Sequence, residues 1–264
     1  NLTWKLAAVV HGHADRSLLD SYEHERRPVG ARNVQWATFN FYNHLAAGAG
    51  FGMLPGAPEE HNRAALEALF ADTTDGGNRR ARLAEFYWTA RREFQQLDIE
   101  LGFDYAGSPV VVADGTERPP HDPLERDYQP VTRPGHRMPH AWLTRGDESI
   151  STHHLLVPGR FLLLAGGDGE PWCDAACRCA GELGIEIDSY RIGPASELAD
   201  RDLEWARVRQ HGDDGAILVR PDGHVAFRAR ERATDARGDL ERALRTALGL
   251  TENPAPVASP AATA

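Results

Sequence analysis

The sequence predicts a mixed α/β protein in which a mainly helical first part precedes an α/β domain. Two observations support this fold class. Apolar residues recur at helical spacing over residues 1–100, whereas residues 141–250 alternate strand and helix patterns separated by turn residues. With 264 residues, the chain is long enough for one large domain or two smaller ones.

The first part is predicted to contain five helices. Asp15 is a suitable N-cap for the second of them. Pro28 is expected to break or kink the chain and to begin the third. Gly76 and Gly77 should introduce the longest helix, which Gly102 is suited to cap. The helices are predicted over residues 1–11, 16–26, 29–47, 59–71 and 79–100.

Residues 103–140 form a predicted connection between the two parts. A short strand is expected within residues 108–112, because this stretch is rich in valine, and an Asp114-Gly115 turn follows it. The rest is rich in proline and polar residues, which indicates an ordered segment that runs over a surface.

The α/β domain is predicted over residues 141–250 in the order strand, helix, strand, helix, strand, strand, helix. Parallel strands joined by helices, followed by a hairpin and a covering helix, match a thioredoxin-like core. Asp222-Gly223 is the expected hairpin turn. Residues 251–264 are rich in proline and alanine and are predicted to be a disordered tail. The strands are predicted over 160–166, 185–193 and the hairpin 215–230, and the helices over 171–184, 202–212 and 237–250.

Composition excludes several classes of partner. The net charge of −10 argues against non-specific binding to nucleic acid. No apolar run approaches the roughly 18 residues of a membrane span. Three cysteines crowded at positions 173, 177 and 179 do not form a disulfide framework. A cytoplasmic protein is therefore expected, with neither nucleic acid nor a membrane as its partner.

Three sequence blocks carry a resemblance to a known family. They are Asn1-Leu2-Thr3-Trp4-Lys5-Leu6-Ala7, Glu25-Arg26-Arg27-Pro28-Val29 and the hairpin sequence LVRPDGHVA. The blocks resemble the single-component FAD-dependent aromatic hydroxylases, which include phenol and chlorophenol hydroxylases and polyketide-tailoring monooxygenases. RPGHRMPHAWL (133–143) resembles the entry into the C-terminal, thioredoxin-like domain of that family, and the resemblance spans roughly residues 1–248.

The resemblance implies the C-terminal portion of such an enzyme. Residues 1–102 would be the helical C-terminal part of a FAD- and substrate-binding domain, 103–140 the connection and 141–250 the thioredoxin-like domain. The implied activity is hydroxylation of a phenolic or polyketide ring with FAD, NAD(P)H and O₂, in natural-product biosynthesis for the polyketide case. FAD and NAD(P)H would be bound mainly by a missing N-terminal part upstream of Asn1.

No cofactor-binding residue is predicted in this chain. GAGFGML (48–54) contains glycines but follows a helix, whereas a dinucleotide fingerprint follows a strand. AGGDGEP (165–171) does stand between a strand and a helix, but it fits the first turn of a thioredoxin-like core better than a phosphate site. No catalytic group can be assigned.

The third helix offers the candidate substrate-lining residues Asn33, Trp36, Asn40 and Asn43, which recur at helical spacing. In the family this helix runs beside the aromatic substrate cavity, so Trp36 could stack on a ring while the amides hold substrate oxygens. The alternative is a core tryptophan with solvated asparagines. Structural roles are predicted for Glu25, Arg26 and Arg27, with the two guanidinium groups bridging domains through bidentate hydrogen bonds.

Two other functions stay open. A split gene could leave this chain as an accessory or dimerisation subunit that completes a flavoprotein in trans, and the aromatic helix around Trp88 could be a homodimer face or part of a core. A thioredoxin-like redox protein is the other option, but the spacing of Cys173 and Cys177 is not Cys-x-x-Cys. His11 with His13 and His153 with His154 lack companion ligands, so no metal is predicted.

Overall fold

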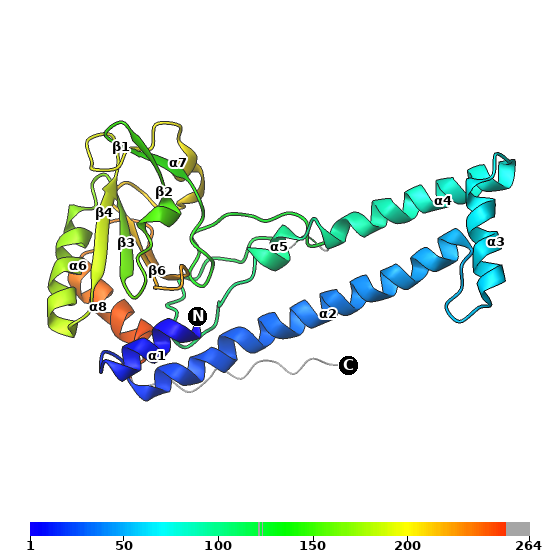
Figure 1. Ribbon diagram of the computed structural model, residues 1–264. Coiled ribbons are helices and arrows are strands. Elements are labelled where there is room, and N and C mark those ends of the chain that lie inside the picture. Colours follow the sequence, from blue (N-terminus) through cyan, green and yellow to red (C-terminus); the bar gives the residue numbers. More distant parts are fainter. Residues whose placement is uncertain (121, 123, 252–264) are drawn as a thin grey trace. The chain divides into compact units, whose positions relative to one another are not determined.

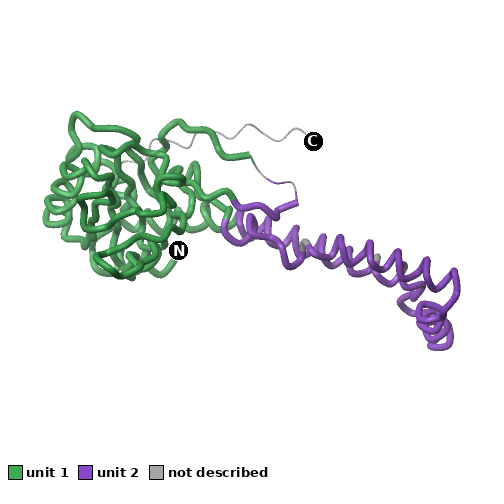
Figure 2. Tube along the Cα trace, turned by 90° about the horizontal axis from the view of Figure 1, so that it is seen from above, with its two compact units in different colours: residues 1–27, 102–120, 129–264 green, residues 28–101, 121–128 purple. Residues whose placement is uncertain are grey.

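The computed structural model describes residues 1–120, 122 and 124–251. By contacts they divide into two compact units, coloured separately in Figure 2. Unit 1 comprises residues 1–27, 102–120 and 129–264, and unit 2 comprises residues 28–101 and 121–128. Most of the predicted tail lies outside the described residues. The domain boundaries expected from the sequence stay a prediction.

Unit 1 is built on a four-stranded sheet in the order β4-β3-β5-β6. β3 (Phe161–Gly166) pairs in parallel with β4 (Ile187–Ile192) and antiparallel with β5 (Ala216–Val219), which pairs antiparallel with β6 (Val225–Ala229). This order of strands and helices confirms the predicted thioredoxin-like core (Figure 1). The Asp222-Gly223 turn joins β5 to β6, with Gly223 at a positive φ of 80°.

The sheet is covered on both faces, and alternate residues of β3 divide between them. Phe161, Leu163 and Ala165 pack in one apolar cluster with α6 and α8, whereas Leu162 and Leu164 pack in a second cluster around α7 and the hairpin of β1 (Trp142–Arg145) and β2 (Glu148–Ser151). Successive side chains of a strand point to opposite faces, so a strand buried on both faces reads as a continuous apolar run. The helices are α6 (Glu170–Leu183), α7 (Glu204–Val208) and α8 (Ala236–Ala247).

The first residues of the chain belong to unit 1. α1 (Leu2–Val10) places Trp4 edge-on against Phe161 of β3, with ring centroids 6.0 Å apart. The Asp15 side chain accepts a hydrogen bond from Ser17 N at 2.8 Å, which confirms the predicted N-cap. It caps a 3₁₀ turn, Arg16–Leu19, that leads directly into α2.

The expected break at Pro28 does not occur. α2 runs without interruption over Asp20–Phe51 and contains Pro28. Proline lacks an N–H and disturbs the preceding turn, but a long helix can continue past it when only that one hydrogen bond is lost. The boundary between the two units nevertheless falls at this residue.

In unit 2, the helix predicted over residues 79–100 begins and ends earlier than expected. α3 (Glu59–Phe70) is followed by α4 (Thr74–Ala90), so Gly76 and Gly77 lie inside the helix. Thr73 caps it by accepting a hydrogen bond from Gly76 N at 3.1 Å, a stronger start signal than the glycines that follow. The helix also ends early, and a 3₁₀ turn (Arg91–Glu93) and the short α5 (Leu97–Glu100) replace its predicted last turns.

The connection also departs from the prediction. Residues 108–112 form no strand; Val112 N makes a single hydrogen bond to Ala226 O at 2.8 Å. A hairpin that was not predicted follows, made of β1 (Trp142–Arg145) and β2 (Glu148–Ser151). The only local signal for it is the turn sequence Gly146-Asp147.

Gly166 at the end of β3 should not tolerate a side chain. A Cβ there would lie 2.3 Å from Asp213 O, a backbone atom that cannot move aside easily. We expect Gly166→Ala to lower the free energy of unfolding by about 1–3 kcal/mol, as overpacking does. Urea denaturation monitored by circular dichroism measures this.

Gly181, in the last turn of α6, is the matched control. A Cβ there meets nothing within 4 Å, so Gly181→Ala should be neutral or stabilise by about 0.5–1 kcal/mol. Equal destabilisation by both substitutions would contradict the close approach at Gly166.

Candidate functional site

A buried cluster of charged side chains joins three segments of unit 1. Glu25 of α2 accepts hydrogen bonds from Lys5 Nζ at 2.7 Å and from Arg220 Nη1 and Nη2 at 2.5 and 3.0 Å. Arg220 Nη2 also donates to Asp222 at 2.6 Å, and Lys5 Nζ donates to Ser21 Oγ at 2.6 Å. The side chains of Lys5, Glu25 and Arg220 are fully buried. We call Lys5, Glu25, Arg220 and Asp222 the Glu25 cluster.

Neutral donors complete the hydrogen bonding of the two carboxylates. Asn1 Nδ2 donates to Glu25 at 2.7 Å and to Asp222 at 2.9 Å. Ser108 Oγ donates to the other oxygen of Glu25 at 2.8 Å. Two cations and two carboxylates therefore balance in charge, with each carboxylate bonded by several donors, which is the arrangement that makes buried ions tolerable.

The cluster keeps its acids ionised. Burial would raise the pKa of Glu25, but the hydrogen bonds and charge of Arg220, together with the charge of Lys5, outweigh it and lower that pKa to about 2. Burial likewise opposes ionisation of Asp222, yet the Arg220 charge holds the pKa of Asp222 well below its usual range. Burial lowers the pKa of Lys5, and Glu25 offsets this only in part.

Each of the three sequence blocks that carry the family resemblance contributes to the Glu25 cluster. Lys5 comes from the first block, Glu25 from the second, and Arg220 and Asp222 from the hairpin. Sequence reasoning singled out Glu25 but missed its partners. The signal that could have found one of them is that Lys5 is the only lysine in the chain.

The neighbours of Glu25 lie outside this cluster. Arg26 Nη1 donates to Tyr105 Oη at 3.0 Å, and its guanidinium lies 5.2 Å from the Phe103 ring centroid. Arg27 forms a pair with Glu23 at 3.1 Å in which both side chains are about three-quarters exposed. The bridging of domains by Arg26 and Arg27 stays a prediction.

Three of the four predicted substrate-lining residues share an unusual property. Trp36 Nε1, Asn40 Oδ1 and Asn43 Nδ2 are buried without a hydrogen-bond partner among the described residues, whereas Asn33 is exposed. Each buried, unpaired polar atom costs about 1–3 kcal/mol. The three atoms follow one stripe of α2 in unit 2, and their role in lining a substrate cavity stays a prediction.

Ion pairs flank this stripe on α2. Arg32 Nη2 lies 2.9 Å from Asp98 and also contacts Glu125, and His44 Nε2 lies 2.6 Å from Glu93. All these residues belong to unit 2. They tie α2 to the segment after α4 on either side of the stripe.

The glycine-rich stretches do not fit a dinucleotide. Gly48 and Gly50 lie inside α2. At the β3–α6 turn, the protein's own backbone fills the space beside Gly166, and a Cβ at Gly193 would lie 2.8 Å from Gly167 Cα. A pyrophosphate needs backbone N–H groups with open space before them, and neither stretch supplies it.

The cysteines give no support to redox chemistry. All three are free, and burial raises the pKa of the Cys173 thiol and of the Cys179 thiol. Disulfide exchange requires a thiolate, which a raised pKa makes scarcer.

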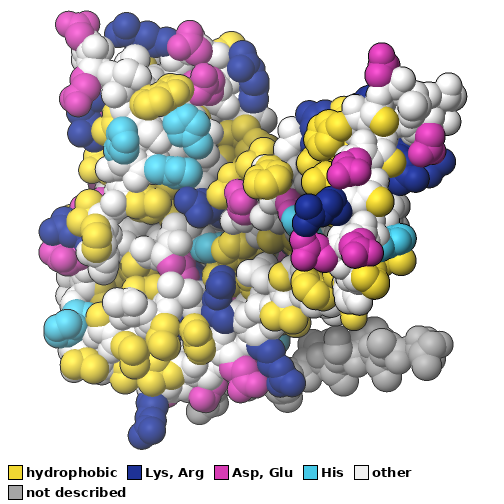
Figure 3. Space-filling view, turned by 45° about the vertical axis from the view of Figure 1, so that its right-hand side comes forward, with side chains coloured by type: hydrophobic (Ala, Val, Ile, Leu, Met, Phe, Trp, Pro, Cys, Tyr) yellow, Lys and Arg dark blue, Asp and Glu magenta, His cyan; other side chains and the backbone are white. Residues whose placement is uncertain are grey.

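Figure 3 shows a group of histidine side chains close together on one face. The ring of His140 lies 5.8 Å from that of His153, and His154 lies 6.3 Å from Trp142. Within residues 1–120, 122 and 124–251, no three His, Cys, Asp or Glu side chains are arranged to hold a metal ion.

None of the helices in residues 1–120, 122 and 124–251 combines the length and hydrophobicity needed to cross a bilayer.

Two family models match the chain. The model described as aromatic-ring hydroxylase, C-terminal, matches residues 131–251, and the FAD-binding domain model matches residues 1–37. The first match covers the thioredoxin-like core, and the second covers α1 and the part of α2 that holds Glu25.

Known proteins are similar over nearly the whole chain. Phenol 2-monooxygenase of Pseudomonas sp. (strain EST1001) is 35% identical over 89% of this chain and 39% of its own length. Tetracenomycin A2 monooxygenase-dioxygenase of Streptomyces glaucescens is 33% identical over 95% of this chain and 37% of its own length. The crystal structure of the flavin-dependent monooxygenase PieE in complex with FAD and substrate matches with a TM-score of 0.79 and 36% identity, covering 94% of this chain and 42% of that one. The chain thus spans about two fifths of the length of these relatives.

Replacing Glu25 with Gln should destabilise unit 1 strongly. The substitution leaves Lys5 and Arg220 buried with only Asp222 as counter-charge, and breaking a buried pair in this way costs about 3–5 kcal/mol. Glu23→Gln is the control, since it removes a carboxylate from an exposed pair worth at most about 0.5 kcal/mol. Urea unfolding compares the two; similar losses would refute the role of the cluster.

The stability of the protein should fall in acid in two stages. Burial lowers the pKa of His211 from 6.5 to about 4, and the pKa of Glu25 lies near 2 instead of 4.5. Both groups are protonated more readily in the unfolded chain, so stability declines as the pH falls, first between 6.5 and 4 and then between 4.5 and 2.

The Glu25 shift alone corresponds to about 3 kcal/mol. The Glu25→Gln variant should therefore show a smaller decline below pH 4.5, where Asp222 still contributes, and keep the decline above it. Free energies of unfolding measured from pH 7 to pH 3 test this, and an unchanged slope below pH 4.5 would count against it.

Proposed function

We propose, on the premise that the chain belongs to the family of FAD-dependent aromatic-ring hydroxylases, that it is part of a flavin-dependent monooxygenase. This enzyme hydroxylates a phenolic or polyketide aromatic substrate with FAD, NAD(P)H and O₂. The observation that carries the proposal is the similarity to phenol 2-monooxygenase over 89% of this chain.

The residues that bind FAD are assigned to the part of such an enzyme that lies outside the region matched by this chain. The glycine-rich stretches described above do not fit its pyrophosphate, and the relatives are more than twice as long as the matched region. When bound, the flavin supplies the oxidation chemistry, and the protein supplies orientation and exclusion of water. The contribution of this chain is therefore structural support and one wall of the substrate cavity.

That wall is the stripe of Trp36, Asn40 and Asn43. Their buried, unpaired polar atoms support the assignment, because a substrate carrying hydroxyl or carbonyl oxygens would supply the missing hydrogen bonds to the two donors, and a hydroxyl would supply one to the acceptor. The indole ring of Trp36 also offers an apolar face to an aromatic ring. Asn33 is left out of this wall, since it is exposed.

A protein partner is also part of the proposal. Tyr87, Trp88 and Phe94 in unit 2 are 59%, 68% and 85% exposed, so the aromatic helix is not a core element of this chain. Three exposed aromatic side chains in one segment support a contact with another polypeptide. That polypeptide is either the FAD-binding part of the enzyme or a second copy of this chain in a homodimer. The free cysteines support a cytoplasmic location.

The reaction class can be tested on the full enzyme that contains this chain. The purified protein should show a flavin absorption spectrum, and a phenolic or polyketide substrate should stimulate NAD(P)H oxidation and gain one oxygen atom by mass spectrometry. A colourless protein that oxidises no NAD(P)H with any aromatic substrate would overturn the proposal.

Substitutions on α2 test the substrate wall. Trp36→Ala and Asn40→Ala should lower kcat/KM for the aromatic substrate about 5- to 100-fold, the equivalent of about 1–3 kcal/mol per lost contact. Gln35→Ala is the control, because Gln35 is exposed on the same helix. Unchanged kcat/KM in both variants, with the fold intact, would remove the stripe from the substrate cavity.

A further inference from the structure

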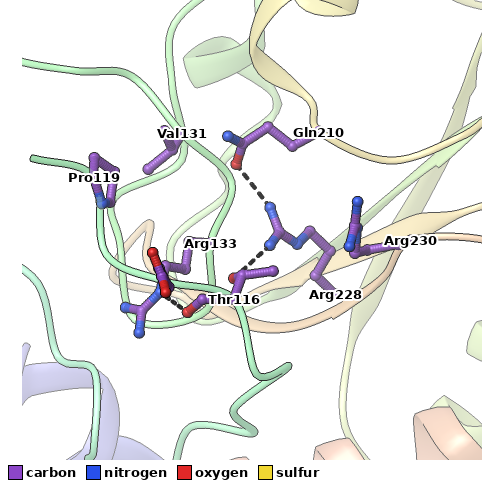
Figure 4. A pocket seen from close by; sticks show the side chains of 8 residues that line it. Thr116, Pro119, Val131, Arg133, Gln210, Arg228 and Arg230 are labelled. Atoms are coloured by element: carbon purple, nitrogen blue, oxygen red, sulfur yellow. Dashed lines mark hydrogen bonds between the residues drawn. The ribbon is translucent and has the colours of Figure 1, made fainter.

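A small pocket in unit 1 is lined by three arginines and is not used by any role described above. It has a volume of about 130 Å³ and lies between the connection (residues 103–140) and the edge strand β6 (Figure 4). Its polar lining consists of Thr116, Glu117, Arg133, Gln210, Arg228 and Arg230. We call it the arginine pocket.

Arg228 forms a rigid side of the arginine pocket. It is only 5% exposed and donates to Asp114 at 2.7 Å, to Thr116 Oγ1 at 2.9 Å and to Gln210 Oε1 at 2.8 Å. Figure 4 shows the last two bonds reaching the Arg228 guanidinium from two different segments. Because Asp114 neutralises Arg228, this side chain fixes the positions of Thr116 and Gln210 and leaves little charge of its own.

Arg133 has donor capacity that the protein does not use. Its Nε donates to Thr116 O at 2.9 Å, but its Nη1 is buried with no hydrogen-bond partner among the described residues. A buried donor of a charged group costs folding free energy when it lacks a hydrogen-bond partner, and such donors are rare in native proteins. This atom points to a ligand that is an acceptor.

The charge of the pocket favours an anion. Arg133 and Arg230 form no ion pair within the described part of the chain, and Glu117 is the one carboxylate in the lining. The pocket is thus net positive in a chain of net charge −10. Gln210 adds an amide N–H group, since its oxygen is taken by Arg228, and it holds a positive φ of 52°. Strained backbone of this kind in a non-glycine residue is concentrated at ligand sites.

We propose that the arginine pocket binds a small oxyanion, with Arg133 Nη1, Arg230 and the Gln210 amide as its donors. Guanidinium groups recognise phosphate and carboxylate oxygens through charge-assisted hydrogen bonds. The volume admits inorganic phosphate or a carboxylate group and excludes a whole nucleotide. The site is separate from the α2 stripe, and it stands whether or not the proposed hydroxylase activity does.

Isothermal titration of the full chain with phosphate tests the proposal, with acetate as a second arm, in buffers of equal ionic strength without other polyvalent anions. We expect a dissociation constant of about 0.1–1 mM and a higher melting temperature with saturating ligand. Tighter binding of phosphate assigns a tetrahedral oxyanion, and tighter binding of acetate assigns a carboxylate. Binding of neither overturns the proposal.

Substitutions locate the site. Arg133→Met should weaken binding about 10-fold or more, and Arg230→Gln should weaken it several-fold without affecting the fold, because Arg230 is exposed and makes no ion pair in the described structure. Arg178→Gln, an equal change of charge on the exposed side of α6, should have no effect. If Arg178→Gln weakens binding as much as the pocket variants do, binding is a non-specific charge effect and the proposal fails.

Discussion

The structure of unit 1 depends on one constraint: four buried charges must stay together. Lys5, Glu25, Arg220 and Asp222 lie in three segments: Lys5 and Glu25 are 20 positions apart near the start of the sequence, and Arg220 follows Glu25 by 195 positions. Such a cluster adds little net stability compared with apolar residues of the same size, but any arrangement that separates its members leaves a bare charge away from water. The cluster therefore selects one position of α1, one position of the start of α2 and one conformation of the β5–β6 turn.

The sequence predicts those parts of the fold whose signals are local. The β5–β6 hairpin follows from Asp222-Gly223, and the end of α6 follows from Gly184, which adopts the left-handed conformation that glycine permits. The structure is predicted less well where two local sequence signals favour different conformations. Pro28 was expected to interrupt a helix that continues through it, and the helix predicted to begin at Arg79, after two glycines, instead begins at Thr74 with Thr73 as its N-cap.

The assembly of the Glu25 cluster could not be predicted, for a physical reason. Nothing in the residues around Glu25 specifies that a hairpin arginine 195 positions later will pair with it, because the pairing is a product of tertiary packing. Helical spacing did place Trp36, Asn40 and Asn43 on one stripe, but only the structure shows that one polar atom of each is buried and unpaired. The Glu25 cluster is satisfied and holds the fold, whereas that stripe and the arginine pocket carry unused hydrogen-bonding capacity, which is where chemistry or binding is to be sought.

The burial of Lys5 has a consequence for the surface of the molecule. Because the chain contains no other lysine, its folded form presents no lysine amine to solvent. Acetylating enzymes, ubiquitin ligases and amine-reactive dyes that require a lysine side chain can then modify this chain only where α1 has come away from the sheet. Labelling at Lys5 therefore reports that opening directly, because molecules in which Lys5 stays buried are not labelled.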